Sequence, residues 1–204
     1  MGREEHADSE PLHAPARLVL VRHGATTWSR DGRHTGRTDL PLDEDGRRQA
    51  ARLGARLAGE KFALVRTSPL RRARETCALA GFADQAVVDG ALAEWDYGEY
   101  EGRTTVEIRA ERPGWQLFRD GCPGGEDAAA VGARVDGFLE QLGEEPDAPG
   151  GTVACFAHGH VLRVLAARWL GLPPEDARLV ALNTASISVL AYEHEWRVVE
   201  RWNS

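Results

Sequence analysis

The sequence predicts an α/β fold of three layers, in which helices cover both faces of a mostly parallel central sheet and a small inserted cap lies over the C-terminal ends of the strands. Two runs of strand-forming residues, 18–22 and 152–157, are apolar almost throughout, which is typical of strands buried on both faces. Segments of helical periodicity alternate with such runs. Residues 92–125 instead combine aromatic residues with glycine and proline, which indicates an insert.

The helices and strands are expected in a regular order. A polar loop over residues 25–41 leads to a helix between Asp43 and Gly59. Ser68 and Pro69 predict the start of a second helix, because serine caps helix amides and proline suits the first helical position. The remaining elements are expected as strands over residues 62–65, 87–88, 187–192 and 196–199, and as helices over residues 69–80, 126–142 and 161–170.

Length and charge limit the domain organisation and the partners. Residues 1–15 mix charges, prolines and histidines, and we expect them to form a disordered leader. Residues 16–204 are expected to form one domain, with the insert 92–125 inside it. The net charge of −7 argues against general binding of nucleic acid or of an anionic membrane surface.

Cysteine usage and hydropathy predict the compartment. Three widely spaced cysteines indicate neither a disulfide framework nor a zinc site, and no apolar run is long enough to span a bilayer. We therefore expect a soluble protein of the reducing cytoplasm. The oligomeric state is left open, a homo-oligomer included.

Two strands each end in a histidine followed by a glycine, at His23-Gly24 and at His158-Gly159. Ligands of open α/β sheets bind beyond the carboxyl ends of the strands, so two such histidines can face each other across one site. The alternative is that each histidine caps a strand or satisfies a core hydrogen bond. Because the context occurs twice, we favour the shared site.

Arg22 precedes the first histidine and points to phosphoryl chemistry. A guanidinium binds phosphate through a planar fork and keeps its charge at working pH. The sequence contains no Walker A loop, no G-x-G-x-x-G, no G-x-S-x-G and no H-E-x-x-H. Histidine is therefore the leading candidate for the nucleophile.

The segment Leu-Val-Arg-His-Gly-Ala-Thr-Thr-Trp-Ser at residues 20–29 resembles the motif of the histidine phosphatase superfamily, in its phosphoglycerate mutase-like branch. Supporting segments follow in the same order at residues 35–42, 67–73, 92–102 and 156–160, so the resemblance spans residues 16–193. Within the branch, the segments 92–102 and 115–126 look like those of actinobacterial acid phosphatases and of sedoheptulose-bisphosphatase-like members.

The resemblance implies a role for each matching residue. His23 would be the nucleophile that becomes phosphohistidine, and Glu94 would be the proton donor, with the apolar side of Trp95 favouring its protonated form. The phosphoryl group would be bound by Arg22, Arg72 and His158. Spacing alone does not choose among Arg71, Arg72 and Arg74; the resemblance selects Arg72.

Further residues are expected to bind the substrate. Ser29 stands where many members have asparagine, and Ala25 replaces a common glutamate. For Ser29, Thr35 and Gly36, capping of the loop is an equal alternative, and the aromatic residues are more often packing than recognition. The full set is Gly24, Ser29, Thr35, Gly36, Trp95, Tyr97, Gly159 and His160.

No metal or other cofactor is expected, because arginines supply the positive charge. His158 and His160 form an H-x-H pair that could ligate zinc, but no carboxylate-rich motif supports this alternative. Glu126 is interpreted as a residue of a helix N-terminus and not as a catalytic acid.

The expected activity is metal-independent hydrolysis of small phosphate monoesters, such as sugar phosphates or bisphosphates. A cofactor-dependent phosphoglycerate mutase is the alternative, and the insert is shorter than in those enzymes and lacks their arginine-rich segment. A non-catalytic phospholigand-binding module is a third reading, disfavoured because His23, Glu94 and His158 are all present. Arg119 either binds a distal anion or is a solvated surface residue.

Overall fold

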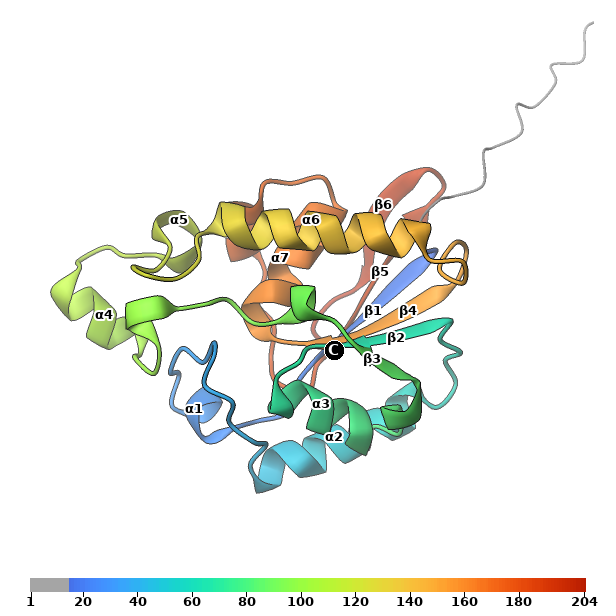
Figure 1. Cartoon of the computed structure of the whole chain (residues 1–204), viewed down its shortest axis with the longest axis horizontal. Coiled ribbons are helices and arrows are strands. Elements are labelled where there is room, and N and C mark those ends of the chain that lie inside the picture. The colour runs from blue at the N-terminus through green and yellow to red at the C-terminus, as the bar shows by residue number, and fades with distance from the viewer. Residues whose placement is uncertain (1–14) are drawn as a thin grey trace, which may run out of the picture.

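A six-stranded sheet with the strand order β3-β2-β4-β1-β5-β6 forms the centre of the computed structural model, which describes residues 15–204 (Figure 1). The first four strands of this order are parallel, β5 pairs with β1 in antiparallel fashion, and β6 pairs with β5 in the same way. The strands are β1 Arg17–Arg22, β2 Leu64–Thr67, β3 Ala86–Val88, β4 Thr152–Ala157, β5 Ile187–Glu193 and β6 Trp196–Arg201. The mostly parallel sheet that the sequence predicts is therefore confirmed.

Helices cover both faces of the sheet. Figure 1 shows α2 and α3 on one side of it and α6 and α7 on the other. The α-helices are α1 Thr27–Arg30, α2 Glu44–Leu57, α3 Arg71–Leu79, α4 Thr105–Glu111, α5 Leu117–Asp120, α6 Ala128–Glu144 and α7 Gly159–Trp169. Short 3-10 helices are η1 Ala83–Gln85, η2 Gly90–Leu92, η3 Gly98–Tyr100 and η4 Pro174–Leu179.

The central strand β1 divides the core into two parts. Leu18 and Leu20 pack with α6 and α7, whereas Val19 and Val21 pack with α2 and α3. Side chains alternate along a strand, so an uninterrupted apolar run supplies both faces of a buried sheet. This burial explains why β1 contains no polar residue between Arg17 and Arg22.

The insert that follows β3 forms the predicted cap. Its segments η3, α4 and α5 lie beyond the end of the sheet at which β1 and β4 terminate (Figure 1). Thr104 begins α4 with a capping box, in which its side chain and Glu107 exchange hydrogen bonds with each other's main-chain N–H. The cap thus lies over the strand ends where the two histidines emerge.

Some boundaries differ from the predicted ones. Helix α3 begins at Arg71, two residues later than expected, since Leu70 is still extended, and the buried Ser68 hydroxyl accepts hydrogen bonds from the Leu70 N–H and from His158. Strand β2 is shifted two residues toward the C-terminus. Of the predicted leader, residues 1–15, all but Pro15 lie outside the described residues.

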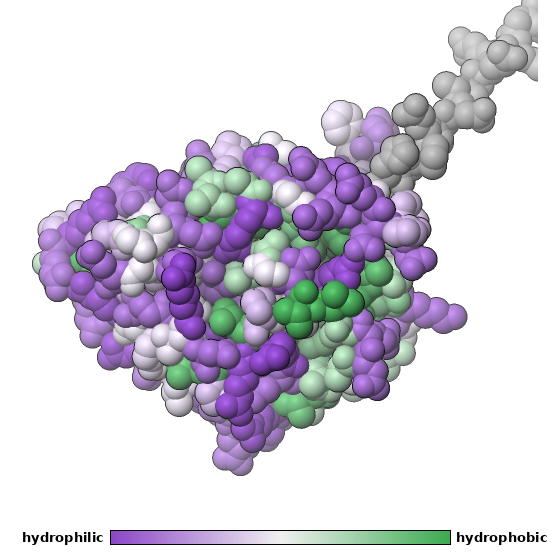
Figure 2. All heavy atoms as spheres, viewed as in Figure 1, coloured by the Kyte–Doolittle hydropathy of each residue, from purple (hydrophilic) through white to green (hydrophobic). Residues whose placement is uncertain are grey.

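The surface is mainly polar. Figure 2 shows hydrophilic residues over most of the face viewed, with apolar residues gathered from its centre toward its right side. Cys77, Cys122 and Cys155 are all buried and unpaired. Within residues 15–204, no helix combines the length and the apolar character needed to cross a membrane.

Candidate active site

Strands β1 and β4 deliver His23 and His158 to the same edge of the sheet. They are parallel neighbours with Arg22 opposite Ala157, and the His23 N–H continues the ladder by donating to the Ala157 carbonyl oxygen at 3.0 Å. The two imidazole centroids are 5.1 Å apart, close to the spacing of about 4.8 Å between neighbouring strands. The sheet therefore brings together the two histidines that the sequence singles out.

The tautomer of His23 follows from its hydrogen bond. Nδ1 lies 2.7 Å from the Gly24 carbonyl oxygen, which can only accept, so Nδ1 carries the hydrogen and the lone pair is on Nε2. Burial, and after it the guanidiniums of Arg22 and Arg72, lowers the pKa of His23 well below its ordinary value. The ring is neutral at pH 7, which leaves Nε2 able to act as a nucleophile.

His158 is fully buried, and both of its ring nitrogens are hydrogen-bonded. Arg72 Nε donates to Nδ1 at 3.0 Å, so Nε2 carries the hydrogen and donates to Ser68 Oγ at 2.7 Å. Burial, followed by the charge of Arg72, lowers the pKa of His158 well below its ordinary value. His158 is therefore a neutral hydrogen-bond donor beside His23.

Arg72 lies in the first turn of α3 and is fully buried. Arg71 instead has 51% of its side chain exposed and pairs with Glu75, and Arg74 is also exposed. Of the three arginines between which spacing could not choose, only Arg72 reaches the site. Its Nη1 and Nη2 atoms donate to carbonyl oxygens of one loop, those of Thr35, Gly36 and Thr38.

The Arg22 guanidinium lies against the backbone of Gly159, where a Cβ atom would be 3.1 Å from Cζ. Nη1 donates to the Leu182 carbonyl oxygen, whereas the buried Nε has no hydrogen-bond partner among the described residues. A buried N–H without a partner carries a free-energy cost, and Arg22 bears it at the point where it packs against Gly159. Gly159 thus contributes to the site because its lack of a side chain allows the Arg22 guanidinium to lie against it.

Glu94 is fixed by three main-chain N–H groups. Its carboxylate accepts from Trp95 at 2.9 Å, from His160 at 3.1 Å and from Val161 at 3.0 Å. The last two belong to the first turn of α7, so the carboxylate lies at a helix N-terminus. The Trp95 ring turns away, and its Nε1 donates to the Glu126 carbonyl oxygen. Trp95 therefore contacts the Glu94 carboxylate through its main-chain N–H and not, as expected, through the apolar side of its ring.

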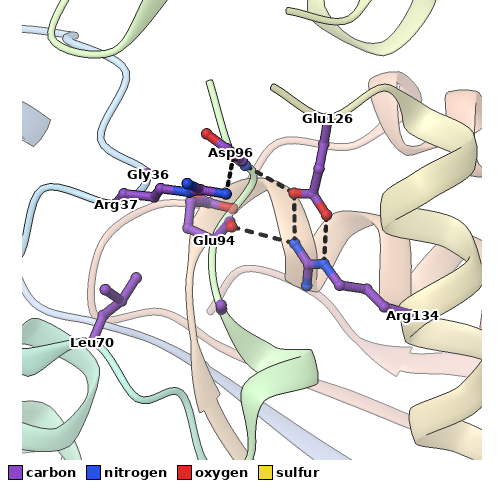
Figure 3. Close-up of a pocket in the computed structure, with 8 residues that line it drawn as sticks. Gly36, Arg37, Leu70, Glu94, Asp96, Glu126 and Arg134 are labelled. Carbon is purple, nitrogen blue, oxygen red and sulfur yellow. Dashed lines mark hydrogen bonds and ion pairs between the residues drawn. The ribbon is translucent and has the colours of Figure 1, made fainter. Parts of the chain in front are cut away.

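A partly buried ion pair holds the chain on either side of Glu94 (Figure 3). Arg134 donates to both carboxylate oxygens of Glu126 at 2.8 and 3.1 Å, and also to the carbonyl oxygens of Ala91 at 2.6 Å and Glu94 at 3.3 Å. Glu126 in turn accepts from the Asp96 N–H at 2.8 Å. Glu126 lies at the N-terminus of α6 as expected, directly before the capping residue Asp127. Its side chain ties residues 91–96 to that helix.

A pocket of about 250 Å³ opens beside His23. The residues of the predicted site that line it are Arg22, His23, Ser29, Thr35, Glu94, Tyr97 and His160. Arg72 and His158 are buried beside this pocket without lining it. The structure therefore brings together seven of the predicted residues around one cavity.

Four of the predicted substrate-binding residues do not line this pocket. Gly24 packs against α2, since a Cβ atom there would be 2.4 Å from the Gly46 carbonyl oxygen. The Gly36 N–H donates to the Glu101 carboxylate at 2.9 Å, and Gly36 lines a neighbouring pocket of about 220 Å³ (Figure 3). Trp95 is fully buried, and Gly159 lies beside Arg22.

Four residues line the pocket without having been predicted: Gly32, Arg33, His34 and Thr105. His34 packs on Tyr97, with ring centroids 4.8 Å apart, and its Nε2 is 3.3 Å from Thr105 Oγ1. These residues belong to a loop and to the cap, where no periodicity marks a functional side chain. The position of Arg33 and His34 directly before Thr35 is the signal that could have revealed them.

Two further expectations concern residues outside the pocket. Arg119 has 59% of its side chain exposed, pairs with Asp120 at 2.7 Å and lines a different pocket, as a solvated surface arginine does. His158 and His160 use ring nitrogens in separate hydrogen bonds, the latter with the Tyr97 hydroxyl at 2.6 Å. Residues 15–204 contain no group of three or more His, Cys, Asp or Glu placed to hold a metal ion.

Comparisons with known proteins agree with this geometry. The family model described as histidine phosphatase superfamily (branch 1) matches residues 18–204. The chain is 42% identical to an acid phosphatase of Mycobacterium tuberculosis over 181 residues, with 87% of each chain covered. It is 37% identical to the sedoheptulose 1,7-bisphosphatase of Saccharomyces cerevisiae over 185 residues, 76% of this chain and 68% of that one. Phosphoglycerate mutases are also among the relatives.

A solved structure from Mycobacterium tuberculosis, the product of the open reading frame Rv3214, superimposes with a TM-score of 0.86 at 40% identity, covering 92% of this chain and 96% of that one. The predicted fold class and the prediction of a phosphoric monoester hydrolase are thereby confirmed. The chain belongs to the histidine phosphatase superfamily, branch 1.

Proposed function

We propose that the protein is a metal-independent phosphatase that hydrolyses monophosphate esters of small sugars through a phosphohistidine at His23. The observation that carries this proposal is the hydrogen bond from His23 Nδ1 to the Gly24 carbonyl oxygen, because it leaves the Nε2 lone pair free in a pocket that Arg22 also lines. A neutral nucleophile and a cationic anion clamp are what phosphoryl transfer without a metal requires.

The reaction has two steps. In the first, His23 Nε2 attacks phosphorus, the P–N bond forms, and the ester P–O bond breaks while the leaving oxygen takes a proton from the Glu94 carboxyl group. In the second, water attacks phosphorus, Glu94 takes the proton of this water, and the P–N bond breaks. Arg22 and Arg72 stabilise the charge on the phosphoryl oxygens in both steps, and the Nε2 hydrogen of His158 would join them by exchanging Ser68 Oγ for a phosphoryl oxygen.

The substrate class rests on the relatives and on the pocket. The two phosphatases compared above are an acid phosphatase and a sedoheptulose 1,7-bisphosphatase, so small phosphorylated metabolites are the compounds to test. A pocket of about 250 Å³ suits a leaving group of this size. A cytoplasmic location, in which the three buried cysteines remain thiols, is part of the proposal.

The test measures phosphate release in EDTA from sugar phosphates, sugar bisphosphates and phosphoglycerates. We expect release by the wild type and a loss of at least a thousandfold in His23→Ala. His194→Asn is the matched control, because it removes a histidine from the β5–β6 turn at a positive φ that asparagine tolerates. Acid-labile, alkali-stable labelling of the wild type by a radioactive phosphate ester identifies the phosphohistidine.

Each other result contradicts part of the proposal. Isomerisation of phosphoglycerate without phosphate release would identify a mutase, the alternative that the sequence leaves open. Binding of phosphate esters with no turnover would identify a binding module. Release that persists in His23→Ala would place the nucleophile elsewhere, and release abolished by EDTA and restored by a divalent metal would refute metal independence.

A further inference from the structure

One wall of the pocket is made of three side chains that the reaction itself does not use. The rings of His34 and Tyr97 are 4.8 Å apart, and those of His34 and His160 are 6.1 Å apart. The Tyr97 hydroxyl is 2.6 Å from His160 Nδ1. This wall, formed by His34, Tyr97 and His160, adjoins Glu94, so it lies where the leaving group of a substrate would be.

Two ring nitrogens of this wall remain available to a bound molecule. His34 uses Nε2 toward Thr105 Oγ1 at 3.3 Å, and His160 uses Nδ1 toward Tyr97. Within residues 15–204, neither His34 Nδ1 nor His160 Nε2 has a hydrogen-bond partner. Among the described residues, the unpartnered polar side-chain atoms that are closed to solvent are Arg22 Nε and Trp169 Nε1. Solvent therefore reaches both His34 Nδ1 and His160 Nε2.

The wall carries no charge at neutral pH. Burial lowers the pKa of His34 to about 4, and burial followed by the charge of Arg163 lowers the pKa of His160 well below its ordinary value. A neutral imidazole nitrogen donates or accepts one hydrogen bond, according to its tautomer. A hydroxyl group matches either tautomer because it does both, whereas a carboxylate or phosphate only accepts, so it pairs with one tautomer alone and gains no salt bridge from a neutral ring.

Apart from Arg22, the one cationic side chain that lines this pocket in the described structure is Arg33. Its Nη1 donates to the Gly102 carbonyl oxygen at 2.7 Å and lies 3.4 Å from the Glu107 carboxylate. Arg33 thus already joins the loop before Thr35 to the cap. This leaves the neutral wall as the main contact surface for the leaving group.

We propose that His34, together with His160 and Tyr97, binds hydroxyl groups of the leaving group, so that the enzyme prefers polyhydroxylated alkyl monophosphates to esters whose leaving group carries a second anion. This inference rests on the proposed function, whose failure is recognised separately below. His34 is the specificity-determining residue, because it lines the pocket with Nδ1 unpartnered and its ring is held there by tilted packing on Tyr97 and by the Thr105 contact.

The test compares kcat/KM for phosphate release from erythritol 4-phosphate and from butyl phosphate, which have the same carbon chain and differ in hydroxyl groups. We expect the wild type to favour the erythritol ester at least tenfold. His34→Phe keeps a ring on Tyr97 but removes both nitrogens, and should lower this preference roughly three- to tenfold, the value of one neutral hydrogen bond. Arg119→Ala, an exposed cap residue outside the pocket, should leave it unchanged.

The remaining outcomes overturn the inference. Equal kcat/KM for the two esters in the wild type does so without any variant, even where His34→Phe does not fold. An unchanged preference in a folded His34→Phe removes His34 from the specificity. A wild-type preference for 3-phosphoglycerate over erythritol 4-phosphate that is lost in Arg33→Gln would show that a second anion is selected instead. No release from these esters or from p-nitrophenyl phosphate would refute the proposed function itself.

Discussion

Arg72 Nε donates to Nδ1 of His158 at 3.0 Å, and this hydrogen bond decides which proton His158 presents. With Nδ1 as acceptor, the neutral ring must carry its hydrogen on Nε2, which donates to Ser68 Oγ. The guanidinium also binds the loop that contains Thr35 and Thr38. Arg72 therefore sets the tautomer of one histidine, lowers the pKa of the other and anchors a pocket wall.

Replacement of Arg72 should impair catalysis and stability together. In Arg72→Gln, the loss of a buried charge beside the phosphoryl position should lower kcat/KM for phosphate release at least a hundredfold, about 3 kcal/mol. The free energy of unfolding should fall by about 2 kcal/mol or more, because buried carbonyl groups lose their donor. Arg71→Gln is the matched control. Urea unfolding of both variants should give Arg71→Gln a free energy of unfolding within about 0.5 kcal/mol of the wild-type value. Comparable losses in Arg71→Gln would refute the distinction between neighbours.

Arg134 should act on the reaction only through Glu94. It contacts the main chain at Ala91 and Glu94 but does not line the pocket beside His23. A displaced proton donor matters for an alkoxide leaving group and little for p-nitrophenolate, which departs as a stable anion. In Arg134→Lys, kcat/KM should therefore fall about tenfold more for glycerol phosphate than for p-nitrophenyl phosphate.

Arg168→Gln provides the control for this leaving-group effect. This substitution removes the 2.7 Å ion pair between Arg168 of α7 and Asp136. Asp136 lies in α6, as Arg134 does, but this pair does not involve the segment around Glu94. Both substrates should keep their wild-type ratio in this variant. If Arg134→Lys lowered the two values equally, Arg134 would be important only for the amount of folded protein.

A glycine at position 159 should be needed to keep the Arg22 guanidinium in its position beside His23. A Cβ atom at 3.1 Å from the guanidinium forces that group to move by a few tenths of an ångström, so Gly159→Ala should lower kcat/KM roughly tenfold. Gly137→Ala, in α6 with nothing within 4 Å of its added methyl group, should raise the free energy of unfolding by up to about 1 kcal/mol and leave activity unchanged. Full activity in Gly159→Ala would contradict the close-approach argument.

Stability should decrease as the pH falls below about 6.5. The folded pKa of His34, about 4, lies below the unfolded value of about 6.5, so the unfolded chain binds more protons between these two values. Its contribution is therefore complete above pH 6.5 and is lost toward pH 4, at about 1 kcal/mol per pH unit. Urea unfolding at pH 5 and pH 6 gives the change in the free energy of unfolding per pH unit. In His34→Phe this change should be smaller than in the wild type by about 1 kcal/mol per pH unit. Equal changes in the two proteins would mean that His34 is protonated in the folded protein.

The fold could be predicted because its central strands report their burial directly. An apolar run such as residues 18–21 needs cover on both faces, and the glycine after His23 marks where the chain leaves the sheet. The same reasoning predicted that His158 would meet His23. Local signals of this kind depend on a few neighbouring residues, so one sequence is enough to read them.

The remaining parts of the site depend on contacts between distant segments. His34 becomes a pocket residue only because Tyr97 and Thr105, from the cap, pack against its loop. Ser68 carries a helix-capping pattern, yet its hydroxyl accepts from His158, ninety residues away in the sequence. Glu126 likewise follows a glycine-rich turn, but its partner is Arg134. No spacing rule within a segment encodes these pairs.

The pairing of β1 with β4 has a consequence for how this protein can be altered. Strands β1 and β4 are paired in register from Arg17 opposite Thr152 to Arg22 opposite Ala157, and His23 and His158 directly follow them. The separation of the two histidines is therefore set by the backbone hydrogen bonds between these strands. A slip of one residue would send every side chain of a strand to the opposite face, so the ladder and the chemistry are lost or kept together. The residues of η3, α4 and α5 belong to neither strand, so they can be replaced without changing the distance between the two histidines. Grafting another segment in their place therefore offers a route to new selectivity on an unchanged reactive centre.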